Sequence, residues 1–340
     1  MDKTVTIIIP THERSQVIDR AIAYYKNLSY NLIICDSSKE SNQIAIYKDK
    51  ITYLHLPDSS FGAKILESLN RVETDYVCLS ADDDFLTETG LLSAFDFLER
   101  NKDYVSANGI YTQFTFLGSH RVIFNQLYQT SKNHRFEVEN IKERVKFSMV
   151  TTPLLYSLFR KEALTEAIKL SLSAPKTTNV EIACNMVPLM FGKHKTISVF
   201  WMARDTRRYT QYNLSENDTN TVINDYKQYL KTEEGINFQN SFVSLYHSVS
   251  GDSKENGSSL FSDVFNNYFQ NQTLKSSKKP VWKNYLRKVI PESFIYFRRK
   301  GIMDRLKIGD QLISKNQDWI RIKQIICKFG FLEEKIDERV

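Results

Sequence analysis

Three consecutive carboxylates, Asp82, Asp83 and Asp84, are the residues of this sequence whose types and spacing most directly imply chemistry. They end an apolar run that begins at Tyr76, and such a run predicts a buried strand that delivers its carboxyl end to a site. Adjacent carboxylates repel one another, so holding them together costs stability unless a cation neutralises them. Mg²⁺ or Mn²⁺ suits this place, because hard cations take oxygen ligands and complete their shell with water and phosphate. The cluster therefore predicts a metal site for a phosphate-bearing substrate, with a solvated acidic turn before a helix at 88–100 as the alternative.

The elements expected before this cluster alternate between strand and helix. Buried β-branched runs predict strands at 5–10, 31–36 and 51–57, and the spacing of apolar residues predicts helices at 15–25, capped by Ser15, and 61–71. This alternation predicts βαβ units and a parallel sheet, whose ligands bind beyond the carboxyl ends of the strands. No G-x-G-x-x-G follows the first strand, which disfavours a dinucleotide-binding domain.

Four segments resemble, in order and spacing, the successive motifs of family 2 glycosyltransferases with the GT-A fold. They are IIIPTHER at 7–14, IICDSS at 33–38, GAK at 62–64 and YVCLSADDD at 76–84. The resemblance implies an α/β fold of the GT-A type, a Rossmann-like and mostly parallel sheet with flanking helices, followed by a helical C-terminal region. It also implies transfer of a sugar from a nucleotide diphosphate donor.

The resemblance assigns roles to single residues. Asp36 is expected to accept a hydrogen bond from the nucleotide base. Asp84 is expected to be the direct metal ligand, with Asp82 as a second ligand, and Asp82 and Asp83 are expected to lie near the ribose. The residues expected to line the nucleotide and its pyrophosphate are Pro10, Thr11, Glu13, Arg14 and Lys64.

The reaction also needs a base that removes the proton of the acceptor hydroxyl. In the resembled family this base is an acidic residue at the start of a helix after the second half of the sheet. Glu181, in the first turn of a helix that Thr178 or Asn179 can cap, is the best-placed candidate. Glu181 could instead close a capping box from Thr178, a motif that needs the same residue type at the same spacing. Glu166 and Asp205 are the second choices for the base.

Downstream of a strand predicted at 150–159, the sequence offers further candidates. Arg207, in a basic cluster at 204–209, is expected to bind the diphosphate, because a planar guanidinium pairs with phosphate oxygens. A solvated turn is the alternative for this cluster. His194 is a weaker candidate metal ligand, since a single histidine is more often structural.

The positive charge of the chain is concentrated near its C-terminal end. The 340 residues carry a net charge of +6, but from Lys275 onward there are 17 Lys and Arg against 8 Asp and Glu, a net +9. Aromatic residues lie among these basic ones, and this mixture predicts reversible binding to an anionic membrane surface, with a basic helix packed on its own domain as the alternative. The four cysteines are far apart, and no apolar run is long enough to span a bilayer. We therefore expect a cytoplasmic protein, peripheral on the inner face of the cell membrane.

These observations combine into one prediction of organisation and activity. Residues 1–212 are expected to form the catalytic domain, with a nucleotide-sugar half at 1–100 and an acceptor half at 101–212, and 213–340 the helical region with the basic tail. The expected activity is metal-assisted, inverting transfer to a saccharide or lipid-linked saccharide in surface polysaccharide or glycolipid assembly, with no nucleic acid partner. The alternatives are a non-catalytic nucleotide-sugar-binding or membrane-tethering module and, less favoured, a phosphatase using Asp82 and Asp84. Phosphatases of that type normally have Thr or Val where this chain has Leu86.

Overall fold

The structure is a computed structural model that describes residues 5–42, 51–117, 121–128, 136–149, 154–174, 176–205, 226–277 and 316–329. Its strands are β1 (Val5–Thr11), β2 (Asn31–Asp36), β3 (Ile51–His55), β4 (Tyr76–Leu79), β5 (Phe85–Leu86), β6 (Tyr104–Leu117), β7 (Arg121–Tyr128), β8 (Leu158–Arg160) and β9 (Lys193–Asp205). Its helices are α1 (Ser15–Tyr25), α2 (Phe61–Asn70), α3 (Glu88–Arg100), α4 (Ile141–Lys146), α5 (Lys161–Ser171), α6 (Thr177–Met186), α7 (Pro188–Phe191), α8 (Tyr226–Tyr229), α9 (Glu233–Ser250), α10 (Lys254–Ser277) and α13 (Gln317–Phe329).

Within the described ranges, nine strands form one sheet in the order β3-β2-β1-β4-β8-β6-β9-β5, with β7 paired to β6. The first four are parallel, and their register aligns Thr11 with Asp36 and Ile8 with Leu79. The carboxyl ends of β1, β2 and β4 therefore meet at one edge of the sheet. Beyond β4 the sheet is mixed, because β8 is antiparallel to both β4 and β6 while β9 is parallel to β6.

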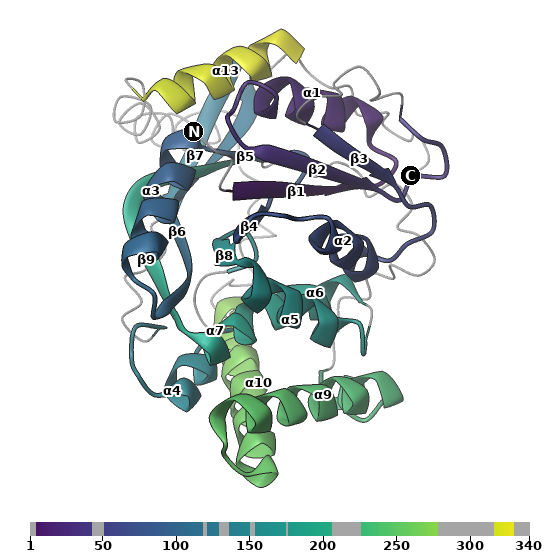
Figure 1. Ribbon diagram of the computed structural model, residues 1–340, viewed down its shortest axis with the longest axis vertical. Helices are drawn as coiled ribbons and strands as arrows, with labels where there is room; N and C mark the ends of the chain where they lie inside the picture. Colours follow the sequence, from purple (N-terminus) through teal and green to yellow (C-terminus); the bar gives the residue numbers. More distant parts are fainter. Residues whose placement is uncertain are drawn as a thin grey trace, which may run out of the picture.

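Helices cover both faces of this sheet. Figure 1 shows α1 and α13 on one side of the parallel strands and α2, α5 and α6 on the other. Alternate residues of β1 reach the two cores: Ile7 and Ile9 pack on the side of α1 and α13, and Ile8 packs on the side of α2 and α5. Burial on both faces explains why these strands read as continuous apolar runs. The α/β fold class predicted from the sequence is confirmed.

Two local predictions were wrong. Ser15 is the first helical residue of α1 rather than its cap, and Arg14 occupies the N-cap position without a side-chain capping bond. The strand expected at 150–159 is limited to β8, since residues 154–157 form a turn closed by a 2.8 Å hydrogen bond from the Ser157 amide to the Leu154 carbonyl. Residues 150–153 lie outside the described part of the chain.

The C-terminal helices join the two cores separately. α9 and α10 share the core of α5, α6 and α7, whereas α13 lies beside α1 at the top of Figure 1. Trp319 and Ile322 of α13 are buried there. The domain boundary predicted at 212/213 falls outside the described residues and stays a prediction, as does the function of the basic tail, most of which is also outside.

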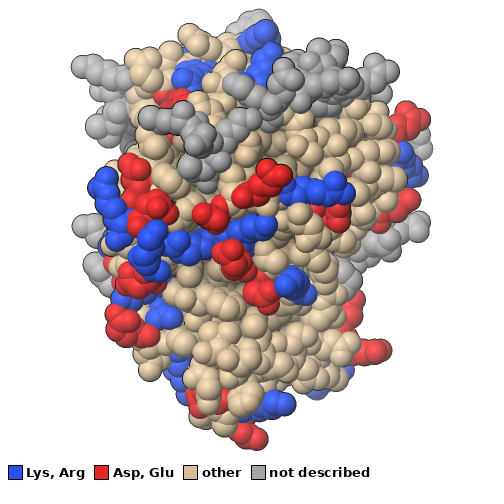
Figure 2. Space-filling view, in the orientation of Figure 1, with Lys and Arg blue, Asp and Glu red and all other residues tan. Residues whose placement is uncertain are grey.

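Charged side chains are unevenly spread over the face seen in Figure 2. Lys, Arg, Asp and Glu gather in a band across the middle of the molecule, with basic and acidic groups interleaved. Below this band, in the region of α9 and α10, the visible surface carries fewer charges. Among the residues that the structure describes, no helix has both the length and the apolar character needed to cross a bilayer.

Candidate active site

The acidic cluster lies between β4 and β5, at the carboxyl edge of the parallel strands. A turn that places the Asp84 amide 3.3 Å from the Ala81 carbonyl positions the cluster. Asp82 and Asp84 are 3% and 2% exposed, while Asp83 is only partly buried. The expected solvated turn is therefore wrong, because two of the three acids are removed from water.

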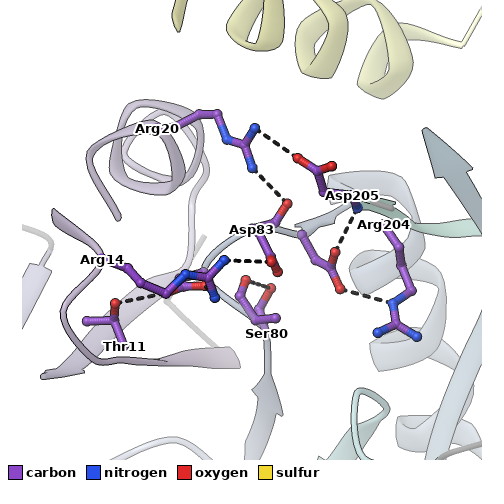
Figure 3. Close-up of polar contacts among 10 residues, drawn as sticks. Thr11, Arg14, Arg20, Ser80, Asp83, Arg204 and Asp205 are labelled. Atoms are coloured by element: carbon purple, nitrogen blue, oxygen red, sulfur yellow. Dashed lines mark hydrogen bonds and ion pairs between the residues drawn. The ribbon is translucent and has the colours of Figure 1, made fainter. Parts of the chain in front are cut away.

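Two residues at the end of β1 bind the first two acids: Thr11 is the last residue of the strand, and Arg14 follows it. Arg14 donates from Nη1 to Oδ1 of Asp82 at 2.7 Å and from Nη2 to Oδ2 of Asp83 at 2.8 Å. The Thr11 hydroxyl donates to Oδ2 of Asp82 at 2.8 Å. Figure 3 shows Arg14 lying across the acidic cluster from the side of Thr11. The structure thus brings together four residues that the sequence predicted for the site.

Asp84 is bound from the opposite side by the end of β9. Arg204 donates from Nε to Oδ2 of Asp84 at 3.1 Å, and the Asp205 amide donates to Oδ1 at 3.0 Å. The Arg204 guanidinium also lies over the ring of Tyr156, 5.5 Å from its centroid. A strand from the mixed part of the sheet therefore ends directly on the last of the three acids.

The pKa values of Asp82 and Asp84 depend on the neighbouring acid and on the two arginines. The pKa of Asp82 is raised to about 6 and that of Asp84 to about 7, mainly by burial and in part by the charge of Asp83. Arg14 opposes this effect at Asp82, and Arg204 opposes it at Asp84. Without these guanidinium groups, the buried carboxylates would lose their charge more readily as the pH falls.

The divalent cation expected to neutralise the cluster stays a prediction, and in the structure Arg14 and Arg204 supply positive charge to the three acids. Both oxygens of Asp82 and both oxygens of Asp84 accept hydrogen bonds from protein groups. Within the described ranges, no group of three His, Cys, Asp or Glu residues is arranged to hold a metal ion. A cation could still use Oδ2 of Asp84 if Arg204 released it, and the Arg204 side chain is 40% exposed and so has room to move.

Asp36 lies at the end of β2, fully buried, and its carboxylate organises the neighbouring loop. Oδ1 accepts from the Ser38 amide at 2.8 Å and from the Ser38 hydroxyl at 2.5 Å. Oδ2 accepts from Nδ2 of Asn42 at 2.8 Å and from the Tyr53 hydroxyl at 2.7 Å. The residue stands at the predicted edge of the sheet, and the sequence had not predicted these four donors.

The remaining predicted nucleotide residues lie along the same edge. Lys64 is buried in α2 and donates from Nζ to the Thr11 carbonyl at 2.7 Å and to the Ser37 hydroxyl at 2.9 Å. Glu13 has a positive φ of 51°, and its carboxylate accepts from the Lys39 amide at 2.8 Å. Pro10 is a partly buried residue of β1. Arg207 lies outside the described residues.

Glu181 lies in α6, with its side chain exposed to solvent. The capping-box alternative is wrong, because α6 begins at Thr177 and its N-cap makes no side-chain bond. The protein packed around Glu181 raises the pKa of its carboxyl, and the charge of Arg204 lowers it. The charges of Asp84 and Glu181 both raise the pKa of Tyr156, so the phenol lies within electrostatic reach of both acids.

The other candidate residues have structural partners. Glu166 forms a surface ion pair with Lys169 at 2.8 Å. Asp205 points its carboxylate at the buried Arg20 rather than outward. His194 is buried, with Nδ1 2.8 Å from the Ser106 hydroxyl, and burial lowers its pKa to about 3. His194 is therefore neutral and part of the strand packing.

Sequence reasoning missed two groups that bear on the acids. Arg20 of α1 donates to the Asp83 carbonyl at 3.0 Å, and the Tyr25 hydroxyl lies 2.8 Å from the Ser80 hydroxyl. Both residues are on the helix face that packs on the sheet, where an apolar interpretation is the natural one. In the sequence, the only indication of a role for Arg20 was its charge on a helix face that is otherwise apolar.

No curated protein matches the chain. Among solved structures, S. aureus TarS 1–349 in complex with UDP is 12% identical, with 95% of this chain and 90% of that chain covered and a TM-score of 0.47. The same TarS fragment in complex with UDP-GlcNAc is 12% identical, with coverages of 81% and 92% and a TM-score of 0.44. A longer TarS structure is 13% identical with a TM-score of 0.44 and covers 78% of this chain, and the match spans only 54% of that chain.

Part of the chain matches a known protein family. The family described as Glycosyl transferase family 2 matches residues 6–166, a range that includes β1 to β4 and the acidic cluster. The four motifs that suggested this family from the sequence all lie inside the match. Residues 6–166 of this chain therefore match the family described as Glycosyl transferase family 2.

Proposed function

We propose that the protein transfers a sugar from a nucleotide diphosphate-sugar to an acceptor hydroxyl, with inversion at the anomeric carbon. The observation that carries this proposal is the pair of arginines, Arg14 and Arg204, that converge from opposite sides on a buried acidic cluster inside the family match. Guanidinium groups at this edge of the sheet suit a ligand that carries phosphate. Asp36, at the neighbouring strand end, suits recognition of a nucleotide base by an N–H donor of that base.

The reaction is a single in-line displacement. The acceptor oxygen attacks the anomeric carbon, the bond from that carbon to the diphosphate oxygen breaks, and its electron pair leaves with the diphosphate. Arg204 and Arg14 are placed to compensate the negative charge that develops on the leaving group. Lys64 is buried behind Thr11 and supports the backbone of that strand end.

A divalent cation, Mn²⁺ or Mg²⁺, fits this site through Asp84, with Asp82 beside it, once Arg204 has released Oδ2. When bound, it would supply further positive charge for the leaving diphosphate. Hard cations of this kind are held by one or two carboxylates and by substrate phosphates, so a cluster of three protein ligands is not required.

Glu181 is the base in this proposal. Its exposed carboxylate can reach a hydroxyl of an acceptor in solvent, and it accepts the proton as the new glycosidic bond forms. Its raised pKa suits that role, because a base works best when its pKa is close to the working pH. Asp205, which faces Arg20, is unsuited to it.

The acceptor is proposed to be a saccharide or a lipid-linked saccharide in surface polysaccharide or glycolipid assembly. The support is the basic tail, with 17 Lys and Arg against 8 Asp and Glu from Lys275 onward. Attraction to anionic lipid would hold the protein on the inner face of the membrane, where such acceptors would be encountered.

Incubation of the purified protein with a panel of nucleotide diphosphate-sugars, with and without Mn²⁺, tests the activity. Release of the nucleoside diphosphate by wild-type protein, and its loss in Asp84→Asn, is the expected result. Tight binding of a nucleotide-sugar without release would instead favour a non-catalytic binding module. Release of phosphate from a simple phosphomonoester, with no sugar donor, would favour a phosphatase.

A further inference from the structure

Arg20 and Asp205 form an ion pair that is shut off from solvent, with both side chains 0% exposed. Nη1 of Arg20 lies 3.2 Å from Oδ2 of Asp205, and Nη2 donates to the Asp83 carbonyl at 3.0 Å. The guanidinium also lies over the ring of Phe85, 5.2 Å from its centroid. Figure 3 shows Arg20 reaching from α1 to both partners. One side chain thus ties together α1, the acidic cluster and the end of β9.

The same end of β9 touches the acid that the proposed function uses. The Asp205 amide donates to Oδ1 of Asp84, and the adjacent Arg204 binds Oδ2. Arg20 therefore holds the backbone on each side of this contact: Asp83 through its carbonyl and Asp205 through its carboxylate. A shift of either segment would move Asp84 and Arg204 relative to each other.

A gain in stability does not by itself explain the buried ion pair of Arg20 and Asp205. Buried ion pairs lose much of their Coulomb energy to desolvation, and replacing them by apolar residues of similar volume is often neutral or stabilising. The Nε atom of Arg20 is also buried without a hydrogen-bond partner in the described part of the chain. Catalysis depends on the placement of reacting groups to within an ångström, so a link that fixes these groups matters more for activity than for stability.

We propose that Arg20 and Asp205 are positioning residues that hold Asp84 and Arg204 in register for sugar transfer. This inference rests on the proposed function, since it gives the pair a role in the same site. Neither residue touches substrate; both act through the backbone of the acidic cluster and the end of β9.

The test is the double variant Arg20→Met with Asp205→Val, which removes both charges with little change in total side-chain volume and keeps the backbone donor at 205. We expect its thermal stability to be kept or raised, its kcat to fall about 100-fold and its KM for the donor to change little, as expected for a lost transition-state interaction. Asp205→Asn keeps an acceptor facing Arg20 and should retain most of kcat. If the double variant fails to fold, Arg20→Lys, which keeps the charge but cannot reach both partners as a fork, should show the same selective loss of kcat.

A control variant and a second readout separate position from stability and from activity. Arg144→Met removes another buried arginine, whose donors bind the carbonyls of Leu189, Val138 and Glu139, and should lower stability without a selective loss of kcat. Hydrogen exchange of the amide at 205 should be faster in the double variant, because the link that holds it to Asp84 is weakened.

Wild-type kcat in the double variant, or unchanged exchange at 205, would overturn the inference. Equal losses in Asp205→Asn and the double variant would overturn it too, because the carboxylate would then act directly. A wild-type protein that is inactive with every donor would count against the proposed function alone, since the exchange measurement does not use activity.

Discussion

Arg204 binds Asp84 through a 3.1 Å contact between its Nε and the carboxylate Oδ2, although 120 residues separate the two in the chain. The same guanidinium lowers the pKa of Glu181 on α6. One arginine therefore couples Asp84 electrostatically to Glu181, the proposed base. In the proposed reaction, this coupling would make the pH dependence sensitive to Arg204, which does not itself titrate near neutral pH.

Arg204→Met should move the acid limb of the kcat/KM profile to higher pH. The protein packed around Glu181 raises the pKa of its carboxyl and the charge of Arg204 lowers it, so removal of that charge lets the base be protonated at a higher pH. The profile is measured for wild type, for this variant and for Arg71→Met, which removes only a surface partner of Glu67. An acid limb that stays in place would show that the titrating base is not coupled to Arg204.

Glu181→Gln should lower kcat about 100-fold or more, because a general base contributes about that factor. Binding of the nucleoside diphosphate, measured by calorimetry, should be kept, and so should the melting temperature, since Glu181 makes no capping bond in α6. Glu166→Gln is the matched control, because Glu166 pairs with Lys169 on the surface of α5. Near-normal turnover in Glu181→Gln would exclude it as the base.

The parallel half of the sheet could be predicted because each of its strands is apolar on both faces and ends in polar residues. Such a pattern is local, so the edge that carries Thr11, Asp36 and Asp84 followed from the sequence alone. The counter-ions could not be predicted in the same way. Arg20 and Arg204 reach the acidic cluster from 63 and 120 residues away, and only the packing of α1 and β9 brings them there.

The mixed half of the sheet was harder to predict for a related reason. β8 has only three residues, and its antiparallel pairing with both β4 and β6 depends on tertiary contacts rather than on a repeating pattern. Arg14 shows the same limit within the site. Its position beside the nucleotide edge was expected, but its bonds to Asp82 and Asp83 depend on the turn between β4 and β5.

Asp36→Ala should weaken binding of the nucleoside diphosphate by on the order of 1.5–3 kcal/mol, the usual contribution of a hydrogen bond to a charged group. Tyr53→Phe is the control, because it removes one donor to the Asp36 carboxylate and leaves the acceptor in place. Titration calorimetry of both variants separates recognition of the nucleotide base by Asp36 from its structural role in the loop after β2. Wild-type affinity in Asp36→Ala would show that another residue binds the nucleotide base.

Asp318→Ala should lower the free energy of unfolding by roughly 1–3 kcal/mol, because it leaves partly buried donors of α3 without their carboxylate partner. The Asp318 carboxylate accepts from the amides of Glu88 and Thr89, at 3.1 and 3.0 Å, at the first turn of α3. Urea unfolding measures the loss, and Lys323→Ala, on the exposed side of α13, is the control. Equal stability of the two variants would show that α13 does not stabilise α3.

The basic tail should bind vesicles that contain anionic lipid and release them as salt is added. Each basic side chain near an anionic surface contributes about 1 kcal/mol, and the attraction is screened beyond a Debye length of roughly 10 Å at 0.1 M salt. Co-sedimentation with anionic and neutral vesicles at low and high salt measures this. Equal binding to both kinds of vesicle, unaffected by salt, would reject an electrostatic attachment.

The contact between Asp318 and the first turn of α3 spans 230 residues of sequence. During synthesis, the strands and helices up to β9 leave the ribosome long before α13 does. Until then the amides of Glu88 and Thr89 lack their carboxylate partner, and the apolar face of α1 that Trp319 covers stays open to water. The nascent sheet and its helices thus remain incomplete until a late segment of the same chain has been made. During that interval they are open to aggregation unless a chaperone protects them.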